Sequence, residues 1–129
     1  MGTNAEWDRL LAKSHPGRRS LLYLDPAGPA TVPVIDALTR KMAAALNRGV
    51  PPDQGYRWRG FHGCECGAMS SNYDLSLPDA RFATNSLAVH YVACHRARCE
   101  AWELSVISGW TEEAEPTQEQ LHGWHLKRG

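Results

Sequence analysis

Thiol and imidazole side chains gather in the middle of this sequence at spacings that suit metal chemistry. Cys64 and Cys66 stand one residue apart in the stretch FHGCECG, and His62 precedes the first of them by two residues. His90 and His95 follow later, in the stretch HYVACH. Thiolates and imidazoles are the usual ligands of tetrahedral Zn²⁺. These donors therefore predict a Zn²⁺ site whose candidate ligands are Cys64, Cys66, His90, His95 and His62.

The spacing within each pair bears on this prediction. Gly67 follows the second cysteine, and glycine lowers the steric cost of the sharp turn that places two sulfurs around one ion. The His-x4-His gap between His90 and His95 lies within the range seen in zinc fingers, whereas Cys-x-Cys is tighter than their usual cysteine spacing. The resemblance to a ββα zinc module is therefore loose.

A regular helix favours a different pair of ligands. At about 100° per residue, His90 and His95 project roughly 140° apart, whereas His90 and Cys94 project only about 40° apart. His95 and Cys99 are aligned equally well. The two histidines meet one ion if their rings reach sideways or if the helix loosens. Cys94 and His62 therefore remain alternatives to His95 as the fourth ligand.

Other roles for the cysteines have to be weighed against a metal. A single cysteine in a helix is usually a small buried hydrophobic residue, which is the first expectation for Cys94 and Cys99. Cys64 and Cys66 are different, because two neighbouring thiols are a reactive liability in a reducing compartment unless something occupies them. For this pair, the alternatives to a metal are a redox or catalytic role and no special role.

Three functions fit these residues. The first is a small zinc-binding protein with a mainly structural metal, which acts as an interaction or accessory module for a protein partner. The second is a small zinc-dependent hydrolase or lyase with an open metal position. Its base would be Glu65 or a more distant acid, but Glu65 points away from the ion if the segment is extended. The third is a thiol redox protein that uses Cys64 and Cys66.

The composition argues against some classes of binding partner and suggests a cellular compartment. The 129 residues contain 14 Lys and Arg and 14 Asp and Glu, so the formal charge is zero. This balance argues against general electrostatic binding to nucleic acid or to an acidic membrane. The sequence shows no run of about eighteen apolar residues and no signal-peptide pattern. We therefore expect a cytoplasmic protein, in which clustered cysteines favour metal binding or catalysis over disulfides.

The helix and strand patterns around the candidate site predict an α+β fold. We expect a small antiparallel sheet of hairpins that packs with two to four helices and is held to them by a zinc ion. The length fits a single domain over residues 1–110 with the metal site within 56–99. Residues 111–129 are expected to form a C-terminal extension. A capping-box pattern of Thr117 and Gln120 predicts a short helix there.

Periodicity locates the main elements. Apolar residues on one helical face, with Thr31 as the N-cap, predict a helix over 31–48. A second helix is expected over 86–98, capped by Asn85 or Ser86, with a break near Cys99 before the helical pattern resumes. Alternation predicts a hairpin of NYDLSL and RFATN, and further extended segments in RSLLYL and YRWRGFHGC. A helix after Thr3 is also expected.

Overall fold

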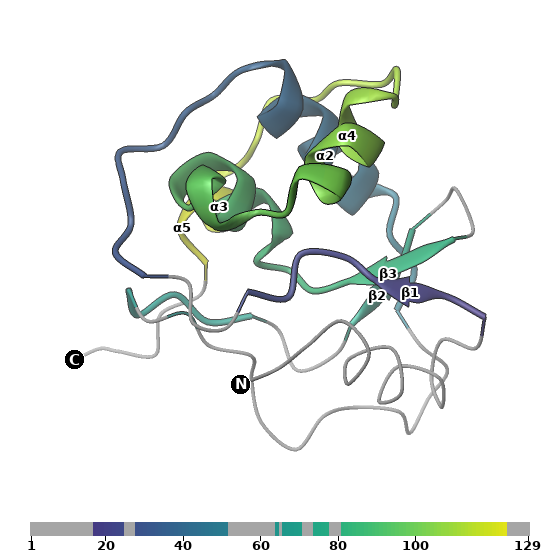
Figure 1. Ribbon diagram of the computed structural model, residues 1–129, viewed down its shortest axis with the longest axis horizontal. Coiled ribbons are helices and arrows are strands. Elements are labelled where there is room, and N and C mark those ends of the chain that lie inside the picture. Colours follow the sequence, from purple (N-terminus) through teal and green to yellow (C-terminus); the bar gives the residue numbers. More distant parts are fainter. Residues whose placement is uncertain are drawn as a thin grey trace.

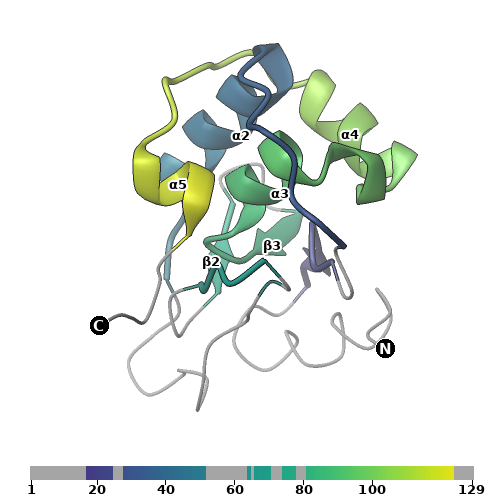
Figure 2. The same cartoon turned by 90° about the vertical axis from the view of Figure 1, so that its left-hand side faces the viewer.

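The structure is a computed structural model, which describes residues 17–24, 28–51, 64, 66–70, 74–77 and 81–123. Within these ranges four α-helices gather on one side of a three-stranded sheet, as the two views in Figures 1 and 2 show. The predicted α+β class is therefore confirmed. The helix expected after Thr3 and most of the segment YRWRGFHGC lie outside the described residues. No helix in the described part combines the length and the apolar character that a membrane span requires.

The small sheet is mixed rather than purely antiparallel. Its strands, in the order β1-β3-β2, are β1 (Arg19–Ser20), β2 (Leu75–Ser76) and β3 (Phe82–Thr84). β2 and β3 are antiparallel with Leu75 opposite Thr84, as the predicted hairpin requires. β1 lies parallel to β3, with Arg19 opposite Phe82. Alternation in the sequence locates a strand, but it does not show which neighbour the strand pairs with or in which direction.

The first described helix, α2 (Ala37–Asn47), begins later than predicted. Its N-cap is Asp36, whose carboxylate accepts a hydrogen bond from the Thr39 N–H at 3.2 Å, so the assignment of Thr31 as the cap is wrong. The residues before Asp36 instead lie along another helix, because the Thr31 and Val34 N–H groups donate to the carbonyls of Cys94 and Ala93. These longer-range bonds keep the segment out of α2.

Helix α3 (Ala88–Cys94) lies at the centre of the described part of the chain. All seven of its residues are buried, and it packs against both α2 and α5. It is shorter than the predicted helix over 86–98, because the chain leaves helical geometry at His95. A short 3₁₀ helix, η1 (Arg96–Arg98), then leads to α4 (Ala101–Ser108), so the predicted break is present.

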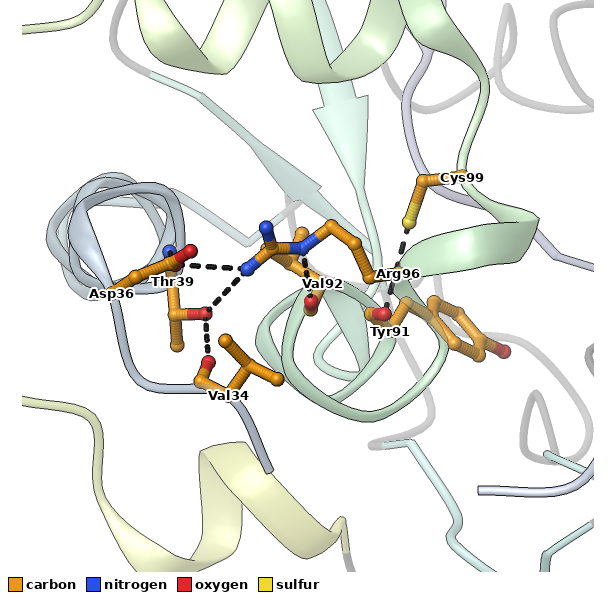
Figure 3. Close-up of polar contacts among 7 residues, drawn as sticks. All are labelled: Val34, Asp36, Thr39, Tyr91, Val92, Arg96 and Cys99. Carbon is orange, nitrogen blue, oxygen red and sulfur yellow. Dashed lines mark hydrogen bonds and ion pairs between the residues drawn. The ribbon is translucent and has the colours of Figure 1, made fainter. Parts of the chain in front are cut away.

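A salt bridge joins the start of α2 to the region that follows α3. The Arg96 guanidinium lies 2.8 Å from the Asp36 carboxylate and donates a further hydrogen bond to the Thr39 hydroxyl at 3.3 Å (Figure 3). Its Nε also donates to the Val92 carbonyl at 2.7 Å. The pKa of Asp36 is lowered, chiefly by the hydrogen bond from Arg96. These contacts set the position of α2 against α3.

A buried carboxyl group supports an unusual backbone conformation in the core. Leu22 is fully buried and has a φ of 62°, a region that large side chains rarely occupy. Its N–H donates to the Glu103 carboxyl at 2.7 Å, and its carbonyl accepts a hydrogen bond from the Asn85 amide at 3.0 Å. Burial raises the pKa of Glu103, and hydrogen bonds from the Leu22 and Glu100 N–H groups oppose this shift.

The last described helix is α5 (Gln118–His122), which lies beside α3 (Figure 2). It begins with the capping box that the sequence predicts. The Thr117 hydroxyl accepts the Gln120 N–H at 3.0 Å, and the Gln120 side chain accepts the Thr117 N–H at 3.0 Å. The division of the chain at residue 110 stays a prediction.

Candidate metal centre

A tight turn carries the two neighbouring cysteines. The Gly67 N–H donates to the Cys64 carbonyl at 2.9 Å, and the Cys64 N–H donates to the Ala68 carbonyl at 2.8 Å. Gly67 has a φ of 104°, which residues with a side chain rarely adopt. The turn thus uses the conformational freedom that the sequence predicts for Gly67. It brings the sulfur atoms of Cys64 and Cys66 to 3.5 Å from each other.

The end of α3 brings the two histidines together. His90 lies within the helix, whereas His95 is its C-cap, with φ −134° and ψ 39°. On an uninterrupted helix the two side chains would project roughly 140° apart. Because the helix ends at Cys94, the imidazole rings instead approach with their centroids 4.9 Å apart and their planes at 71°. The loosened helix therefore removes the geometric objection to this pair.

Cys64, Cys66, His90 and His95 form one cluster, here called the Cys/His group. All four donor atoms lie within 4.8 Å of one another. The Cys64 sulfur lies 3.2 Å from Nε2 of His95, and the Cys66 sulfur lies 3.3 Å from Nε2 of His90. The group could hold a metal ion.

Three of the donor separations come close to those of a tetrahedral Zn²⁺ site. Zinc bonds of about 2.3 Å to sulfur and about 2.0 Å to nitrogen imply S–S and S–N separations of about 3.8 Å and about 3.5 Å. The observed S–S separation is 3.5 Å, and the two S–N separations are 3.2 and 3.3 Å. These three separations are each roughly 0.2–0.3 Å shorter than the ideal values, and the remaining donor pairs lie within 4.8 Å.

A backbone carbonyl sets the protonation pattern of one imidazole. Nδ1 of His90 lies 2.7 Å from the carbonyl oxygen of Leu121 in α5. A carbonyl only accepts hydrogen bonds, so in this contact Nδ1 carries the proton. In the neutral ring the lone pair is then on Nε2, which faces the Cys66 sulfur. Metal-bound histidines commonly donate their second N–H to a carbonyl in this way.

Exposure differs across the Cys/His group. The side chains of His90 and His95 are buried, whereas Cys64 is partly buried and Cys66 is exposed. The group therefore lies at the edge of the core, with two donors from the hydrophobic interior and one that reaches the surface. Such a position lets a bound ion connect a surface turn to the core.

Cys94 and Cys99 lie outside the Cys/His group. The Cys94 thiol faces the Leu121 carbonyl at 3.8 Å, and burial, with a smaller effect from Cys66, raises its pKa. The Cys99 thiol donates to the Tyr91 carbonyl at 3.7 Å (Figure 3), and burial raises its pKa to about 12. Both behave as the buried packing residues that the sequence predicts. His95, and not Cys94, therefore joins His90 in the Cys/His group.

His62 and Glu65, which the sequence suggests as a ligand and as a base, lie outside the described residues. The Leu121 carbonyl beside His90, in contrast, was not predicted from the sequence. Leu121 was missed because a backbone carbonyl leaves no side-chain signal in a sequence. The capping box of Thr117 and Gln120 predicts a helix, but it does not show that the helix lies against His90.

Two hollows are present elsewhere on the described surface. The larger, of about 430 Å³, lies between α2 and the segment after α4, and the smaller, of about 280 Å³, lies between α2 and α5. Lys41, Arg48 and Trp110 are among the residues that line the larger one. Neither hollow is lined by a member of the Cys/His group.

Comparison with known proteins adds no assignment. The chain matches no family model, no curated protein and no solved structure. What the Cys/His group does is therefore inferred from its geometry and from the chemistry of its donors.

Proposed function

We propose that this chain is a small zinc-binding protein in which Cys64, Cys66, His90 and His95 hold a structural Zn²⁺ ion. The observation that carries the proposal is the convergence of four donor atoms within 4.8 Å. Thiolate and imidazole donors suit Zn²⁺, whereas Mg²⁺ and Ca²⁺ prefer oxygen. Four protein ligands complete a tetrahedral shell, which is typical of structural sites, because catalytic sites keep one position open.

The ion would connect the cysteine turn to the end of α3. Structural Zn²⁺ contributes on the order of 10 kcal/mol of binding free energy in zinc-finger peptides, and this free energy becomes folding free energy. Ala68 of the turn is already buried in the same hydrophobic core as α3, and the ion would add a direct connection between the turn and the helix end. The metal would therefore maintain the fold, and the protein would act through its surface as an interaction or accessory module for a protein partner in the cytoplasm.

Metal content tests this proposal directly. We expect about one zinc per chain when the full-length protein is purified under reducing conditions, dialysed without chelator and measured by elemental analysis. Cys64→Ser and His90→Gln should lose the metal. Cys99→Ala and His122→Gln are the matched controls, because Cys99 is buried outside the Cys/His group and His122 is exposed on α5.

Two outcomes would contradict a zinc site. One is a metal-free wild-type protein whose melting temperature does not change when Zn²⁺ is added. The other is a Cys64→Ser protein that keeps full zinc content. A metal-free protein in which Cys64 and Cys66 cycle reversibly between dithiol and disulfide would support the redox hypothesis instead.

The coordination number separates a structural from a catalytic metal. Cobalt(II) in place of zinc reports its geometry through its visible absorption, which differs between four and five ligands. We expect a tetrahedral spectrum that does not change when azide is added, because four protein donors leave no position for it. A spectrum that azide changes would show an open position and favour the hydrolase or lyase hypothesis.

A further inference from the structure

The C-terminal segment over residues 117–123 contacts both parts of the Cys/His group. On the α3 side, the Leu121 carbonyl accepts the hydrogen bond from Nδ1 of His90 and also faces the Cys94 thiol. Leu121 itself is buried, with 3 % of its surface exposed. The segment thus covers the side of His90 that faces away from the sulfur atoms.

On the other side, Gly123 lies directly against the cysteine turn. A Cβ atom at Gly123 would lie 2.7 Å from Cβ of Ala68 and 2.7 Å from Leu87, and 3.1 Å from the backbone nitrogen of Met69. Ala68 belongs to the turn, because its carbonyl accepts the Cys64 N–H. Gly123 also has a φ of 73°. No other residue type fits this contact without moving the turn or the segment.

The segment has little stability of its own. α5 has only five residues, and isolated helices of this length do not persist in water. The stretch between α4 and α5 forms no regular structure. Within the described residues, a backbone bond from Ala114 to the Arg40 carbonyl and two largely exposed ion pairs, Arg40–Glu115 and Arg48–Glu112, connect it to α2. A further bond, from Gln120 to Asn47 at 2.7 Å, is exposed. The position of α5 therefore depends on the burial of Leu121 in the core and on its contacts with His90 and with the cysteine turn, because the exposed contacts with α2 contribute little.

We propose that residues 117–123 form a latch that responds to the metal, so that zinc binding and docking of α5 stabilise each other. This inference rests on the proposed zinc site and adds a regulated element to it. A metal on Nε2 would fix the His90 ring where Nδ1 reaches the Leu121 carbonyl. A metal on Cys64 and Cys66 would fix the turn on which Gly123 rests. Conversely, docking of α5 holds the tautomer and the turn that the metal needs, since coupling between two sites is reciprocal.

Hydrogen exchange tests whether zinc binding stabilises the docked α5. The Leu121 and Gly123 N–H groups donate to Thr117 and Glu119 within α5, so they are protected only while α5 is formed. Exchange of the peptide over 117–123 is compared in the full chain with zinc and after chelation, in conditions where amides of α2 remain protected. We expect at least tenfold faster exchange of α5 without zinc, and a smaller change in α2.

Two variants test whether docking of α5 strengthens zinc binding. Gly123→Ala should weaken zinc affinity by about ten- to hundredfold, the usual effect of altering groups that support a metal ligand. Its control is Gly17→Ala, because Gly17 has a similar φ of 80° but open space around it. Thr117→Ala removes the cap of α5 without touching the Cys/His group and should weaken affinity by up to about fivefold. Affinity is measured by competition with a chromogenic chelator.

The outcomes separate the latch from the zinc site. If the wild type binds zinc while α5 exchanges equally with and without it, and Gly123→Ala binds zinc as tightly as Gly17→Ala, the latch is wrong and the zinc site stands. If the wild type binds no zinc, both proposals fail. If Gly123→Ala does not fold, the Thr117→Ala affinity decides, and an unchanged value would overturn the coupling.

Discussion

At the scale of single residues, His95 and Cys94 decide how the fourth donor is supplied. Both follow His90 closely, but the His95 ring faces the Cys64 sulfur at 3.2 Å, while the Cys94 thiol points to the Leu121 carbonyl. We expect His95→Ala to lose most of its zinc, because a four-ligand site weakens strongly without one donor. Cys94→Ala should keep about one zinc per chain in elemental analysis. The reverse result would assign the fourth position to Cys94.

Glu103 is the residue whose ionisation should affect stability. Burial raises its pKa above the ordinary value of 4.5, so folding favours the protonated form of the carboxyl group. The stabilisation from this group is therefore fully present below pH 4.5, and it is lost as the pH rises through the raised pKa of the folded chain. Glu103→Gln removes this titration while keeping the shape of the side chain.

The measurement is urea denaturation of the wild type and Glu103→Gln between pH 4.5 and pH 8, a range that starts at the ordinary pKa. We expect the stability advantage of the wild type to shrink as the pH rises. Both proteins carry the same metal ligands, so the difference between them cancels the pH dependence of metal binding. An advantage that grows with pH would mean that hydrogen bonds from Leu22 and Glu100 outweigh burial.

At the scale of elements, Asp36 determines where α2 begins and how it is tied to the region after α3. It caps α2 by accepting a hydrogen bond from the Thr39 N–H, and it forms the salt bridge with Arg96. We expect Asp36→Ala to lower the free energy of unfolding by about 1–2 kcal/mol, through loss of the cap and of a partly exposed ion pair. Asp36→Asn keeps the cap and should lose less than about 1 kcal/mol. Equal losses in urea denaturation would show that the cap contributes nothing.

At the scale of the whole molecule, zinc should determine how stable the fold is. A ligand that binds only the folded chain raises the free energy of unfolding by about 1.4 kcal/mol for each tenfold increase in free ligand above its Kd. We expect the free energy of unfolding to rise by this amount when denaturation is followed at buffered free zinc concentrations. The rise is smaller if the cysteines of the unfolded chain also bind the ion. His95→Ala is the control and should show a flat response. If the free energy of unfolding of the wild type does not change with free zinc, the Cys/His group does not stabilise the fold by binding the ion.

Much of the candidate site was predictable from the sequence, because donor chemistry and tight turns are local. Cys64, Cys66, His90 and His95 were recognisable from residue type and spacing, and Gly67 from the turn that Cys-x-Cys requires. The capping box at Thr117 and Gln120 formed as predicted. The α+β class followed from periodicity, since alternation and helical spacing each depend on near neighbours.

Only the tertiary structure decided which of these features meet. The end of α3 at Cys94 brings the rings of His90 and His95 together, and local helical spacing alone argued against that pair. The parallel pairing of β1 and the start of α2 at Asp36 depend on bonds to residues far along the chain. The Leu121 carbonyl beside His90 carries no side-chain signal at all. These contacts arise from burying α3 on every side, and a local pattern does not record which distant segments will cover a buried helix.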